Sequence, residues 1–187
     1  MILLGALVLL TGAWLLVQVL VAELMGHRAQ VIQLGMGPSL ELTKWGETEL
    51  RLGIIPAGGF VKFDPEQVAV FSFARFSVLN LLPWVVLGGL ALVAGAAVED
   101  FVEGFTLIAR APEVVQHWAS WGEALRGAPL SSLARVEARI VSINLLPLAA
   151  TAGGQVISRM LPERARAVFN VGSLLLFVGL VMFGFLR

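Results

Sequence analysis

The chain has 187 residues, of which 58% are hydrophobic and only 14% are charged, and its mean hydropathy is +0.87. A soluble domain is nearer half apolar and a quarter charged, so contact with lipid is the simplest explanation of the excess apolar residues. The net charge is zero and cysteine is absent, which gives no reason to expect nucleic-acid partners and excludes disulfides and thiolate metal sites.

Four stretches are long and apolar enough to cross a bilayer, which takes about 20 residues. They are 2–22, 76–98, 140–158 and 167–186. The first has no basic leading segment and is too long for a signal-peptide core, so we expect a retained spanning helix. The sequence therefore predicts an α-helical polytopic membrane protein with about four transmembrane helices, built as a single membrane domain over residues 1–187.

The distribution of charge among the connections predicts an orientation. The segments before the second stretch and before the fourth stretch are rich in Lys and Arg, whereas the 99–133 connection is rich in Asp and Glu. The positive-inside rule then predicts cytoplasmic placement of the two basic segments, an external loop at 99–133 and both termini outside, as in a bacterial cytoplasmic membrane. Residues 101–125 fit either an amphipathic helix on the membrane or an ordinary connecting helix.

Residues 35–63 follow a strand pattern. Leu40 and Leu42 alternate with polar residues, as do Leu50 and Leu52, and residues 44–47 between the two runs have the composition of a turn. A Pro- and Gly-containing segment at 56–60 follows. We predict a small membrane-associated β-hairpin over 35–63.

Several segments resemble one family. They are GMGPSL at 35–40, GETELRLGIIPAGGFVKF at 46–63, SINLLPLAATAGGQ at 142–155 and LPERARAVFNVGSLLLFVGLVMF at 161–183. In this order and spacing they are similar to segments of the site-2 proteases, the intramembrane zinc metalloproteases of family M50. The match to the family's I-P-x-G-G-Y/F-V-K segment is the most specific. The resemblance implies a bundle of the site-2 protease type.

The resemblance also locates the positions that carry the family's zinc site. The family has His-Glu-x-x-His on its first helix, and an ungapped reading back from Gly35 places that motif on residues 14–18, which here hold Trp14, Leu15 and Gln18 at the three functional positions. The family's third ligand, an aspartate, falls on Ala152. The resemblance therefore implies a catalytically degenerate member, a pseudoprotease without a metal or other cofactor.

A displaced metal site is the alternative. Glu23 and His27 are four residues apart and share a helix face, and a third ligand would have to come from His117 or from an acid such as Asp64. This would make the chain an intramembrane zinc metalloprotease with an atypical site. The competing interpretation is that Glu23 and His27 mark the interfacial end of the first span.

We therefore expect a non-catalytic scaffold or accessory subunit of a larger membrane complex. Its expected partners are the lipid bilayer, other membrane-protein subunits and a polypeptide client, without nucleic acid. A client could add as a strand along the hairpin edge. The residues predicted for this edge are Leu50, Leu52, Ile54, Gly58, Gly59 and Phe60. A small transporter or channel is a weaker hypothesis, because the expected spans carry no charged side chains in their interiors.

Overall fold

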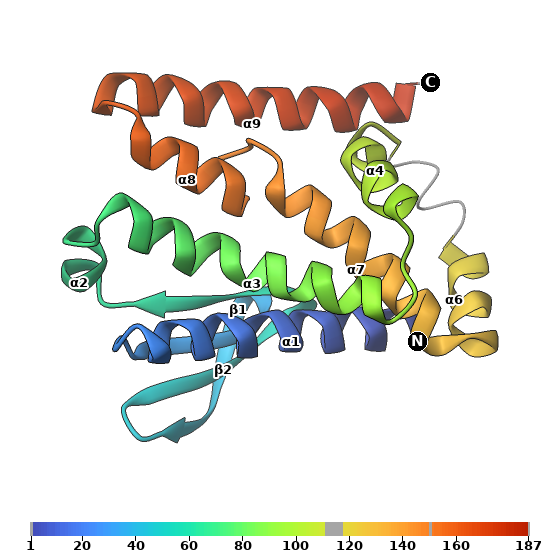
Figure 1. Ribbon diagram of the computed structural model, residues 1–187, viewed down its shortest axis with the longest axis horizontal. Helices are drawn as coiled ribbons and strands as arrows, with labels where there is room; N and C mark the ends of the chain where they lie inside the picture. The colour runs from blue at the N-terminus through green and yellow to red at the C-terminus, as the bar shows by residue number, and fades with distance from the viewer. Residues whose placement is uncertain (1, 111–117, 150, 187) are drawn as a thin grey trace. The chain divides into compact units, whose positions relative to one another are not determined.

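The computed structural model describes residues 2–110, 118–149 and 151–186 (Figure 1). The chain divides into two compact units, Met1–Pro83 and Trp84–Arg187. The first unit contains α1 (Ile2–Leu24), β1 (Ala29–Trp45), β2 (Thr48–Phe63), α2 (Pro65–Ala69) and the start of α3 (Phe73–Val93). The second unit contains the rest of α3, α4 (Val98–Thr106), η1 (Leu107–Arg110), α6 (Trp118–Gly127), α7 (Pro129–Leu145), α8 (Ala152–Met160) and α9 (Glu163–Leu186).

Helix α1 runs without interruption and ends at a glycine. Gly26 has φ +80°, its amide donates to Glu23 O, and the amide of His27 donates to Ala22 O. Glycine adopts this left-handed conformation without the penalty that a Cβ would bring, so the helix stops here and the chain turns into β1. Val21 and Ala22 on α1 form a buried cluster with Phe71 and Leu79.

The sheet consists of two long antiparallel strands, each of which bends. Residues 29–34 pair with 59–63 and also lie beside 49–52, while 39–45 pair with 48–53. The bends contain glycines in the left-handed region, with φ +85° at Gly35 and +67° at Gly58. A Cβ on Gly35 would lie 2.7 Å from Ile55 O, so the G-M-G segment is required for the close crossing of the two strands.

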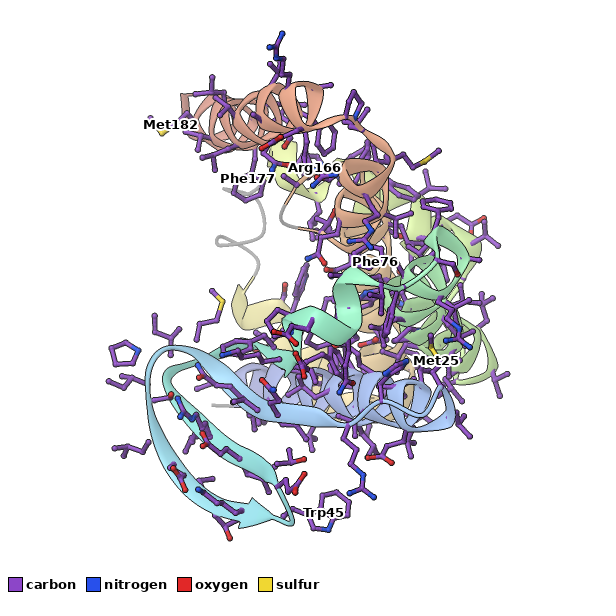
Figure 2. All side chains as sticks on the ribbon, turned by 90° about the vertical axis from the view of Figure 1, so that its left-hand side faces the viewer. Met25, Trp45, Phe76, Arg166, Phe177 and Met182 are labelled. Atoms are coloured by element: carbon purple, nitrogen blue, oxygen red, sulfur yellow. The ribbon has the colours of Figure 1, made fainter. Side chains whose placement is uncertain are left out.

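The hairpin turn expected at 44–47 is present. Trp45 pairs with Thr48, Gly46 has φ +62°, and Trp45 lies at the turn end of the hairpin (Figure 2). The strands begin at Ala29, six residues before the expected start, because the apolar pattern of 29–34 also contributes a strand segment. Gly59 packs on α1, near Leu15 Cδ1 and Thr11 Cγ2, so one face of the sheet covers the helix.

Within the described residues, two helices are long and apolar enough to cross a membrane by length and composition, Leu4–Leu24 and Phe73–Val93. They correspond to the first two expected spans. The second ends at Val93 and not at 98, because Gly95 with φ +102° closes the helix and Ala96 N donates to Ala91 O. The predicted count of four spans is not confirmed, although the fourth stretch lies within α9.

The third expected span, 140–158, is not one helix. Helix α7 ends at Leu145 and α8 begins at Ala152. Pro147 has no amide hydrogen to continue α7. The Thr151 hydroxyl lies 2.8 Å from Leu148 O and accepts a hydrogen bond from Gly154 N, which caps α8. The apolar composition of this stretch hid the interruption. The expected external loop at 99–133 likewise contains the separate helices α4 and α6.

Candidate functional site

The turn of α1 to which the resemblance assigns the family's zinc-binding motif is apolar apart from one amide. Leu15 is 4% exposed and Gln18 is 9% exposed, and Trp14 is partly buried. The Gln18 Oε1 atom is buried and has no hydrogen-bond partner in the part of the chain that the structure describes. Because α1 is uninterrupted, positions 14 and 18 share one face, as a two-ligand motif needs.

The sheet reaches the same level of α1. A Cβ added at Gly59 would lie 3.2 Å from Leu15 Cδ1 and 2.5 Å from Gln33 O. The glycine therefore lets β2 approach the helix closely at the turn that holds Leu15. This contact explains why the I-P-x-G-G-F segment needs glycine at position 59.

Ala152 lies in the second unit, at the start of α8, and is 8% exposed. The turn around it is tightly closed, because a Cβ on Gly153 would lie 2.4 Å from Leu145 O and one on Gly154 would lie 1.7 Å from Leu148 O. The Thr151 hydroxyl also contacts Leu146 O. The turn is therefore held by backbone packing and by a hydroxyl group.

The four positions do not fit the zinc ion that the family implies. The alkyl side chains of Leu15 and Ala152 have no donor atom, and the indole nitrogen of Trp14 carries a hydrogen in place of a free lone pair. Gln18 supplies one carboxamide oxygen, which is a poor ligand for zinc. We therefore derive no chemical step through a metal at these positions.

Glu23 and His27, the alternative pair of metal ligands, lie in different surroundings. Glu23 is exposed, whereas the His27 ring lies 4.3 Å from the Phe71 ring and its Nδ1 is 3.3 Å from Gln67 Oε1. Asp64 accepts a hydrogen bond from Glu66 N and caps α2. Among the described residues no group of three His, Cys, Asp or Glu side chains could hold a metal ion, and His117 lies outside those residues.

The predicted peptide edge is only partly an edge. Leu50 lies between Ile32 and Thr43, and Leu52 lies between Leu34 and Leu40, so both have strand partners on two sides. This part of the prediction was wrong because the bend in β1 brings 29–34 beside 49–52.

Within the described part of the chain, the other four residues of the predicted edge do not have strand partners on two sides. Gly59 and Phe60 pair with β1 on one side, and Ile54 is 71% exposed. Gly58 makes the bend, with its Cβ position near Met36.

Among the described residues, segment 39–45 also has a free side. It pairs with 48–53 on one side, and its Leu40 and Leu42 are 73% and 63% exposed. The sequence pattern alone could not distinguish this segment from 48–54, because both show the same alternation. Only the glycine bend at 35–37 decides which of them is covered.

A partly buried ionic network in the second unit was not predicted from the sequence. Arg139 Nη2 of α7 lies 3.2 Å from Asp100 Oδ1 and 2.6 Å from Glu103 Oε2, both on α4, and its guanidinium lies 5.4 Å from the centre of the Trp121 ring. The signal was present as acids and an arginine 36 to 39 residues apart, a separation that no local pattern reveals.

Glu137 is the second missed residue. It is 5% exposed, and neither of its carboxyl oxygens has a hydrogen-bond partner in the described residues. Burial raises the pKa of Glu137 to about 7. It stands outside both candidate spans, close to the start of the 140–158 stretch.

Comparison with known proteins gives the family. Residues 16–76 match the sequence profile of peptidase family M50. A protein of Clostridium perfringens whose name describes it as a zinc metalloprotease is 48% identical over 48 residues, which are 26% of this chain and 14% of that protein. Both matches support membership of peptidase family M50, the family predicted from the sequence. The aligned part spans about a seventh of that relative.

Proposed function

We propose that this chain is a non-catalytic M50-like membrane protein that acts as a scaffold or accessory subunit and holds a polypeptide client. The observation that carries the proposal is the α1 turn at 14–18, where an uninterrupted helix of family type presents Trp14, Leu15 and Gln18 in place of metal ligands. Family membership and the two apolar helices support the membrane location.

Zinc analysis of the purified protein tests the loss of the metal site. We expect substoichiometric zinc by mass spectrometry after purification in mild detergent, because the corresponding positions offer one carboxamide oxygen. Stoichiometric zinc that disappears in both Glu23→Gln and His27→Ala would overturn the proposal and support the atypical protease.

The client is proposed to add as a strand to the 39–45 edge. Strand addition uses backbone hydrogen bonds and needs no catalytic residue. The segment is exposed on both faces: Leu40 pairs with Leu52 on one face, Glu41 pairs with Arg51 on the other, and exposed Leu42 lies at a bulge between Glu41 and Thr43. An added strand would extend the sheet and cover Leu40 and Leu42.

Proline substitution tests this edge. Leu40 and Glu41 pair with Leu52 and Arg51 in regular register. Consecutive amides of a regular strand point alternately toward the partner and away, so one of Leu40→Pro and Glu41→Pro removes an outward amide and the other a sheet bond. We expect the variant that keeps its thermal stability to lose polypeptides that copurify with the wild type. Val168→Ala, an exposed change on α9, is the control and should retain them. A wild type that purifies alone as a monomer would contradict the scaffold proposal.

A further inference from the structure

Helix α4 combines a buried acidic side chain with exposed apolar side chains. Its acids Asp100 and Glu103 contact Arg139 of α7, and the Asp100 side chain is only 10% exposed. Three of its apolar side chains point away from the unit, with Val98 67%, Val102 59% and Phe105 47% exposed, while Phe101 packs inward. A helix that covers a soluble core has its apolar side inward and its charges outward, so three exposed apolar side chains beside a buried acid are unusual for a helix in water.

The three exposed apolar residues form one stripe. Positions 98, 102 and 105 have the i, i+4, i+7 spacing of a single helix face. The inner side holds Gly104, whose Cβ position would lie 2.7 Å from Arg139 Cα, which fixes α4 closely on α7. Thr106 is exposed on a third, polar side, next to the stripe. The helix therefore has an inner, an apolar and a polar side.

The apolar stripe follows a candidate membrane span along the chain. Helix α3 ends at Val93, which is 88% exposed, and α4 begins at Val98 after the Gly95 turn. The Cβ position of Gly88 on α3 lies 3.5 Å from the Phe101 ring of α4, so the two helices are packed together. The exposed apolar side chains of α3 thus lead directly to those of α4.

We propose that α4 lies in the membrane interface, with the stripe of Val98, Val102 and Phe105 against the acyl chains of the bilayer. The partner is lipid, because the stripe adjoins a span of matching character and carries no charge: Asp100 and Glu103 pair with Arg139, and exposed Glu99 lies on the polar side with Thr106. Thr106 then faces the headgroup region. The proposal rests on the membrane location of α3, which belongs to the proposed function.

The absence of cysteine from the chain makes single-cysteine labelling clean. We would label Val102→Cys and the matched Thr106→Cys with an environment-sensitive nitrobenzoxadiazole dye, and Val85→Cys on the exposed side of α3 as the span control. The full chain is placed in vesicles of phosphatidylcholine and phosphatidylglycerol that contain doxyl-labelled phosphatidylcholine. We expect quenching at Val102→Cys comparable with Val85→Cys and about threefold greater than at Thr106→Cys.

The possible outcomes separate the interfacial position of α4 from the membrane location of α3. Quenching at Val85→Cys without quenching at Val102→Cys would refute the interfacial helix and leave the membrane location of α3 intact. Absence of quenching at both would refute the membrane location as well. Protection of Val102→Cys from aqueous iodide without doxyl quenching would indicate a protein cover and also contradict the proposal, as would equal quenching at Thr106→Cys.

Discussion

The carboxyl group of Glu137 lies on the buried side of α7 and has no hydrogen-bond partner among the described residues. Its pKa is raised by burial from 4.5 to about 7, so the folded protein holds a proton that the unfolded chain releases. The stability that depends on this group is fully present below about pH 4.5 and is lost as the pH rises toward 7. Above pH 7 the loss stays constant.

We therefore predict that Glu137→Gln removes a pH dependence of the free energy of unfolding. The free energy of unfolding of the wild type should fall by up to about 3 kcal/mol between pH 4.5 and 8, because each unit of difference between the folded and unfolded pKa contributes about 1.36 kcal/mol. Thermal unfolding in detergent across this range measures the effect. Glu163→Gln, at the exposed first turn of α9, should keep the wild-type profile. An unchanged profile in Glu137→Gln would show that the carboxyl is solvated.

A second residue-scale prediction concerns Gly154. A Cβ there would lie 1.7 Å from Leu148 O, which is backbone and cannot move aside. We expect Gly154→Ala to lower the unfolding temperature strongly, with a loss of about 3 kcal/mol or more. Gly172→Ala in α9 is the matched control, because nothing lies within 4 Å of its Cβ position, and it should be neutral or slightly stabilising. Equal effects at both positions would contradict the closed turn.

At the scale of elements, the docking of α4 on α7 depends on one cation, the guanidinium of Arg139. Arg139 is 18% exposed in its side chain and bonds to two acids of α4, and Asp100 also accepts from Ala97 N at the start of that helix. Removal of the arginine leaves Asp100 largely buried without its charge partner. The docking of α4 on α7 therefore combines close packing at Gly104 with a partly buried ionic network.

We predict that Arg139→Ala destabilises the second unit by about 3 kcal/mol, the range for breaking a buried pair. Arg135→Ala is the control, because Arg135 is exposed on the same helix. Unfolding temperature and proteolysis within 98–106 report the loss. If Arg139→Ala unfolded like Arg135→Ala, the network would be a weak surface pair.

Local pattern predicted some elements and not others, for physical reasons. The alternation of Leu40 and Leu42 and the turn before Thr48 depend on neighbouring residues, so the hairpin was predictable. The double pairing of 31–34 depends on the crossing at Gly35, a non-local contact. The interruption between α7 and α8 also escaped, because apolar composition measures affinity for lipid and does not report on a missing amide hydrogen.

At the scale of the whole molecule, the family was predictable because its glycine segments have a specific order. The match over residues 16–76 includes Gln18 but begins after Trp14 and Leu15. The positions that the resemblance assigns to the zinc site belong to different units, with Gln18 in the first and Ala152 in the second. The resemblance names these positions from the sequence, and zinc analysis tests whether they bind a metal.

Rebuilding the family motif is the sharpest test of the position assignment. The resemblance predicts that Trp14→His, Leu15→Glu and Gln18→His restore two ligands and a carboxylate on one face of α1, and that Ala152→Asp adds the third ligand. Two histidines alone should hold zinc weakly, and the aspartate should raise the affinity by about tenfold or more because it completes a three-ligand set.

Zinc retained after dialysis, measured in detergent for each combination, decides the assignment. Ala149→Asp is the matched control, because it places the same carboxylate in the same turn at a position that the resemblance does not assign to a ligand. If Ala152→Asp and Ala149→Asp gave equal retention, Ala152 would not be the third ligand position. If no combination retained zinc in folded protein, the ungapped reading from Gly35 to Trp14 would be wrong, and the proposed loss of the metal site would lose its basis.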